Sequence, residues 1–143
     1  MTKKDERIPE HVEEWKTKYL RALADYQNLE RRVRQERQEL RERLSEEIIH
    51  SLLVYFDEIQ KAEKHVKDPG LTLVVKRLDA WLAYHKVKQM DVLHKQFNPH
   101  EMECVEVVEG NKDNEVAEEV RPGYMIGDKV LRVAQVKVGK LPA

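Results

Sequence analysis

The chain has 143 residues, of which 41% are hydrophobic, and its 26 lysines and arginines nearly cancel its 27 aspartates and glutamates. This balance gives no electrostatic reason to expect nucleic acid or an anionic membrane as a partner. A single cysteine, Cys104, excludes an internal disulfide; no apolar run reaches the ~20 residues of a membrane span, and residues 1–10 lack the apolar core of a signal peptide. We therefore expect a cytoplasmic protein.

Residues 1–9 are polar and are predicted to form a disordered tail. A long helix is predicted over residues 10–67, because the chain has neither proline nor glycine between Pro9 and Pro69. At ~1.5 Å per residue this helix would be ~85 Å long, whereas a compact chain of this length has a radius of gyration of only ~15 Å. The helix therefore needs a second copy or another partner along its length.

Apolar residues in the first half of this helix recur at alternating steps of three and four, the heptad spacing of a coiled coil. They are Val12, Trp15, Tyr19, Ala22, Tyr26, Leu29 and Val33. From Val33 to Leu44 the spacing lengthens and the seam includes Arg37, which predicts a weakly packed section. The arginines of residues 31–43 suggest a zipper-type nucleic-acid binder, but six acidic residues from Glu30 to Glu47 would repel phosphate. Zipper proteins also place their basic region before the seam.

A wider apolar stripe over residues 48–59 indicates a helix bundle rather than a two-helix seam. Asp68-Pro69-Gly70 then breaks the helix, and a second amphipathic helix is predicted over residues 71–86, within a bundle segment of residues 70–90. Two copies of this helix pair would form a four-helix bundle. The residues expected at the dimer interface are Tyr19, Tyr26, Leu29, Val33, Leu52, Leu53, Phe56, Leu78 and Trp81.

Residues 91–143 are predicted to form a small C-terminal β domain, which makes the fold class α+β. Short strands are expected at residues 104–108, 115–120 and 129–138, with turns at Gly110, at Gly123 and at Gly127. The last strand alternates most clearly, and one face carries Val130, Ala134, Val136 and Val138 beside Arg132.

Catalytic and metal-binding patterns are weak in this sequence. His94, His100 and Cys104 lie close together, but without the paired spacing of a zinc site. Cys104 lies in an alternating segment and is interpreted as a small apolar residue rather than a nucleophile. The five glycines are scattered and form no phosphate-binding loop. We expect neither an enzyme nor a bound metal or cofactor.

Four segments resemble the GrpE family, the nucleotide exchange factors of DnaK-type heat-shock chaperones. YLRALADYQNLERR (residues 19–32) resembles Y-x-R-x-x-A-[DE]-[FY]-x-N-x-x-[KR]-R, and LLVYFDEIQKA (residues 52–62) resembles L-L-P-V-x-D-x-[LI]-x-[RK]-A. Gly70 with Leu73 and Leu78 resembles the start of the family's second helix, and GYMIGDKVLRVAQVKV (residues 123–138) resembles G-Y-x-x-x-x-[RK]-x-[LI]-R-x-A-x-V-x-V. The chain departs from the family pattern at Val54 (proline), Lys86 (glycine), Asn98 (aspartate) and Met102 (histidine).

The resemblance implies a parallel homodimer with paired long helices, a four-helix bundle and two β domains. One β domain would insert into the chaperone's nucleotide-binding domain and hold its cleft open, so that ADP leaves. The implied partner contacts are Lys61, Lys64 and His65 on the long helix, and Val120, Lys129 and Val138 on the β domain. Packing within strands explains Val120 and Val138 equally well.

The implied structural residues are Gly70, near the bundle, and Arg132, to which we add Gly123 in a turn. A coiled-coil adaptor or scaffold without exchange activity remains the alternative from a different class. A plain scaffold has no need of the pattern at residues 123–138.

Overall fold

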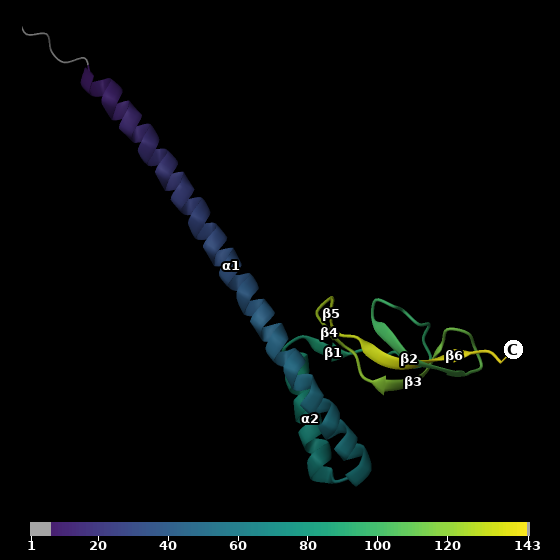
Figure 1. Cartoon of the computed structure of the whole chain (residues 1–143). Helices are drawn as coiled ribbons and strands as arrows, with labels where there is room; N and C mark the ends of the chain where they lie inside the picture. The colour runs from purple at the N-terminus through teal and green to yellow at the C-terminus, as the bar shows by residue number, and fades with distance from the viewer. Residues whose placement is uncertain (1–6, 143) are drawn as a thin grey trace, which may run out of the picture. The chain divides into compact units, whose positions relative to one another are not determined.

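The computed structural model describes residues 7–142. Helix α1 spans Arg7–Val66 and helix α2 spans Pro69–Tyr84, and six short strands follow (Figure 1). The prediction of a long helix is confirmed; residues 7–9 of the predicted tail are helical, and the rest of that tail lies outside the described residues. The described residues divide into two units, one that ends at Ser45 and one that begins at Glu46, and α1 continues from the first into the second.

Backbone conformation explains where the two helices end. Lys67 follows α1 with φ at 51°, and Lys86 follows α2 with φ at 61°, so both lie in the left-handed region that stops a helix. Asp68 then caps α2, because its Oδ1 accepts a hydrogen bond from the Leu71 backbone N–H at 3.0 Å. The family pattern has glycine at position 86, and glycine adopts this φ without steric cost.

The strands form two small sheets. In the first, β1 (Val87–Gln89), β4 (Tyr124–Ile126) and β5 (Lys129–Arg132) are antiparallel in the order β1-β4-β5. In the second, β6 (Ala134–Lys140) lies between β2 (Met102–Glu109), which is parallel to it, and β3 (Val116–Arg121), which is antiparallel. The prediction of a single strand over residues 129–138 is therefore wrong, because the chain changes sheets at Val133.

Each sheet has its own apolar core. The first sheet packs against α1 and α2, and this core contains Ile49, Leu53, Phe56, Leu82, Val87 and Tyr124. The second core contains Met90, Val92, Met102, Val116, Ala134, Val136 and Val138. Val130 was expected on the same face as Val136 but is exposed, because it belongs to the other sheet. Met102, where the family pattern has histidine, is buried among apolar side chains.

Candidate partner-binding site

Asp57 on α1 and Arg132 at the end of β5 form a buried ion pair. Both side chains are only 8% exposed, and Arg132 donates from Nη1 to Asp57 Oδ2 at 2.8 Å and from Nη2 to Oδ1 at 2.7 Å. Arg121 of β3 donates from Nε to the same Oδ2 at 3.2 Å, and Arg132 also donates to the Pro122 carbonyl oxygen. The Asp57 carboxylate of α1 therefore accepts hydrogen bonds from one strand of each sheet, β5 of the first and β3 of the second.

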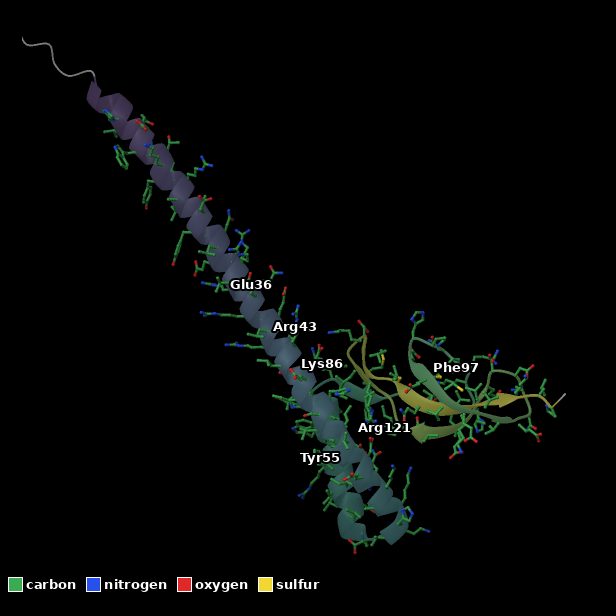
Figure 2. All side chains as sticks on the ribbon, in the orientation of Figure 1. Glu36, Arg43, Tyr55, Lys86, Phe97 and Arg121 are labelled. Atoms are coloured by element: carbon green, nitrogen blue, oxygen red, sulfur yellow. The ribbon has the colours of Figure 1, made fainter. Side chains whose placement is uncertain are left out.

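A small cavity of about 80 Å³ lies beside this ion pair. Helix α1 contributes Gln60, Lys61 and Lys64 to its lining, and β3 contributes Glu119 and Val120. The structure thus brings together two lysines and one valine that the sequence implied as partner contacts. Figure 2 shows Arg121, the next residue of β3, between the helices and the strands.

The charges around the cavity are mixed in sign. Burial raises the pKa of the Glu119 carboxyl, although a hydrogen bond from Gln89 and the charge of Lys64 act in the opposite direction. Neither Lys61 nor Lys64 forms an ion pair with any other residue of the described range 7–142. Both ammonium groups are therefore available to an acidic surface.

Lys129 has an internal partner. Its Nζ donates to both carboxylate oxygens of Glu46 on α1, at 2.9 and 3.0 Å, although the Lys129 side chain is 70% exposed. An exposed pair of this kind contributes roughly 0–1 kcal/mol, so a carboxylate from another protein can replace Glu46 at little cost. His65 lies at the exposed end of α1, where its Nδ1 is 2.8 Å from the Lys61 carbonyl oxygen.

The remaining implied residues have internal roles. Val138 is buried in the core of the second sheet, which favours the packing interpretation of this residue, and we leave it out of the contact face. A Cβ atom at Gly123 would lie 2.6 Å from the Ala134 backbone nitrogen, so no side chain fits there. At Gly70 the same atom would lie 2.9 Å from Asp68 Oδ1, the atom that caps α2.

An open apolar groove of about 320 Å³ lies between α1 and α2. Its lining includes Tyr55, which is 63% exposed and points away from the strands in Figure 2. Leu53 is instead fully buried by its own chain, so we leave it out of the proposed interface. The lining residues are Leu52, Tyr55, Phe56, Ile59, Leu78 and Trp81. In the first unit Tyr19, Tyr26 and Leu29 are exposed and Val33 is partly exposed.

Sequence reasoning missed Asp57 and Arg121 as parts of this site. Asp57 could have been noticed in the sequence, because it is a charged residue inside the apolar stripe of residues 48–59. A charge at such a position needs a buried partner. The sequence could not identify that partner, because Arg121 and Arg132 lie 64 and 75 positions further along the chain.

Within the described residues, no group of three or more histidine, cysteine, aspartate or glutamate side chains could hold a metal ion. In the same range, no helix combines the length and the apolar character needed to cross a membrane.

Comparisons with known proteins identify the family. The GrpE family model matches residues 2–140. The chain is 38% identical over 130 residues to Protein GrpE of Carboxydothermus hydrogenoformans, which covers 85% of this chain and 67% of that protein. It is 32% identical over 145 residues to Protein GrpE of Fusobacterium nucleatum, covering 94% and 72%, and 31% identical over 143 residues to that of Chlamydia abortus, covering 92% and 75%. The chain belongs to the GrpE family.

Proposed function

We propose that this chain is a co-chaperone that accelerates ADP release from a DnaK-type heat-shock chaperone. The match to the GrpE family over residues 2–140 carries this proposal, because it includes the β strands as well as the long helix. A scaffold that needed only a coiled coil would have no use for the two sheets. We therefore rank the adaptor function second.

The proposed mechanism is differential binding, in which no bond is made or broken. The exchange factor binds the open nucleotide-binding cleft more tightly than the closed one, and ADP favours the closed cleft. By linkage, the factor weakens ADP binding by the same ratio as ADP weakens binding of the factor. Each tenfold loss of ADP affinity requires about 1.4 kcal/mol of preference for the open cleft.

The contact face that we propose consists of Lys61, Lys64 and Val120, together with Lys129. The first three line one cavity, and the two lysines have no ion-pair partner in the described part of the chain. Lys129 would exchange Glu46 for an acidic residue of the chaperone. His65 lies one residue after Lys64 and is placed with this face by the family resemblance alone.

The decisive measurement is release of labelled ADP from a DnaK-type chaperone, with and without this protein. Lys129→Glu should slow the accelerated release strongly, because a like charge against an acidic surface costs several kcal/mol. Lys112→Glu is the matched control: Lys112 is also 70% exposed and also pairs with a glutamate, but it lies outside the proposed face. Equal activity of both variants would refute the contact face, and no acceleration by the wild type would favour the scaffold.

We also propose that the chain works as a parallel homodimer. The α1–α2 groove and the exposed seam of α1 are the apolar surfaces that a second copy would cover. Light scattering should give twice the chain mass of 17.0 kDa. A monomer at micromolar concentration would contradict this proposal.

A further inference from the structure

Strand β2 forms an unpaired edge of the second sheet. It is the longest strand, with eight residues, and it pairs only with β6 among the elements that the structure describes. Five consecutive residues, 103–107, are exposed. An edge strand of this length offers a row of free backbone N–H and C=O groups to another chain.

A bulge at Val105 determines which β2 side chains lie on each face. Cys104 is opposite Val136 and Val107 is opposite Val138, whereas Glu106 is opposite Lys137. Val136 and Val138 belong to the buried core, so Cys104 and Val107 lie on the core face of the sheet. The bulge thus keeps both side chains on that face although they are three positions apart.

The core face is left uncovered along this edge. Val107 is 61% exposed although its cross-strand neighbour Val138 is buried. Beside it lies a hollow of about 470 Å³, lined on its apolar side by Phe97, Cys104, Val107 and Val138. Phe97 reaches this region from the loop before β2 (Figure 2). A neighbouring strand would place an alternate side chain into the hollow.

The opposite face of the same edge is acidic. Glu103 lies opposite Gln135, and Glu106 lies opposite Lys137. Lys137 Nζ is shared between two carboxylates, Glu106 at 3.2 Å and Glu118 at 3.1 Å. Two glutamates therefore compete for one lysine, while the one side-chain partner of Glu103 within the described residues is the Gln135 amide, which donates a hydrogen bond to it. This face has an excess of negative charge beside the free edge.

We propose that the β2 edge binds an extended polypeptide segment in which apolar and basic residues alternate. The segment adds a strand next to β2, its apolar side chains fill the hollow beside Val107, and its lysines or arginines face Glu103 and Glu106. A second copy of β2 does not fit this description. Pairing two copies would bring their glutamates together, and like charges across strands are destabilising.

The test uses the full chain and a short blocked, fluorescent peptide in which lysine and valine alternate. Anisotropy should show saturable binding, and backbone amides of residues 104–108 should exchange more slowly in the complex. A permuted peptide of the same composition, with its valines adjacent, should bind much more weakly, because it cannot present an apolar and a basic face at once.

Two charge reversals separate edge binding from general attraction. Glu106→Lys should weaken binding of the alternating peptide by about five-fold or more, because it replaces attraction by repulsion on the free edge. Glu118→Lys is the matched control: Glu118 also pairs with Lys137 and is similarly exposed, at 61% against 58%, but it lies on β3. It should change binding by less than about two-fold.

Three results would overturn the proposal. They are equal weakening by both variants, equal binding of the permuted peptide, and absence of saturable binding up to roughly 1 mM peptide.

Discussion

Replacing Asp57 by alanine should destabilise residues 46–142 strongly. The change removes two hydrogen bonds from the Arg132 guanidinium and one from Arg121. Arg121 is 37% exposed and can turn to water, but Arg132 is 8% exposed and keeps only the Pro122 carbonyl as an acceptor. Breaking a buried pair costs about 3–5 kcal/mol. Since Pro122 and the ring of Tyr124, 5.2 Å from Arg132 Cζ, still stabilise the charge, we expect about 3 kcal/mol.

The control is a variant that removes both charges, Asp57→Leu with Arg132→Met. Apolar residues that replace a buried ion pair leave no charge without a partner, so this double variant should lose less than about 1 kcal/mol. The large single loss and the small double loss together would show that the cost comes from the unpaired guanidinium.

Urea unfolding at one fixed protein concentration measures both losses, because the proposed dimer makes stability depend on concentration. A Trp15→Phe background leaves Trp81 as the only tryptophan, and Trp81 stacks on Phe56 of the core next to the ion pair. A loss below about 1 kcal/mol for Asp57→Ala, or a double variant as damaged as the single one, would refute this reasoning.

Three further predictions follow from the described geometry. Lys86→Gly should stabilise the protein by about 0.5–1 kcal/mol in urea unfolding, because Lys86 has φ at 61°; a loss of stability would contradict this. The buried Tyr124 hydroxyl makes no hydrogen bond of good geometry with the described residues, although the Gln60 side chain lies close enough to lower its pKa, so Tyr124→Phe should be neutral or stabilising. A loss above about 1 kcal/mol would show that the Gln60 contact is a real hydrogen bond. Burial, and next the charge of Asp57, raise the pKa of Tyr124 from 10.0 to about 12. Between those pH values the unfolded chain loses the phenol proton that the folded chain retains, so wild-type stability should fall with rising pH more steeply than that of Tyr124→Phe, by up to about 1.4 kcal/mol per pH unit.

The long helix shows what the sequence could predict. Its existence follows from the absence of proline and glycine over nearly sixty positions, and α1 spans 60 residues. The second helix was predicted to residue 86 but ends at Tyr84, because Lys86 adopts a left-handed conformation that only the family's glycine would have signalled. Helices are predictable here because their hydrogen bonds are local.

The strands and the candidate site were harder to predict from the sequence. β1 and β4 have three residues each, too short for an alternating pattern to appear. The alternation of buried and exposed residues does not reveal that the chain changes sheets at Val133. The residues just before and after it, Arg132 and Ala134, are both buried, so the alternation continues unbroken. The ion pair of Asp57 joins residues that only the fold brings together.

The chain leaves one sheet and enters the other through a single residue, Val133. A linker of one residue has little slack, so a load placed on β6 passes directly to Arg132 and then, through two short hydrogen bonds, to Asp57 on α1. Arg121 connects the neighbouring strand β3 to the same carboxylate. Mechanically, a rotation of the second sheet away from α1 would stretch the hydrogen bond from Arg121 to Asp57, and through Val133 it would also load the two hydrogen bonds from Arg132.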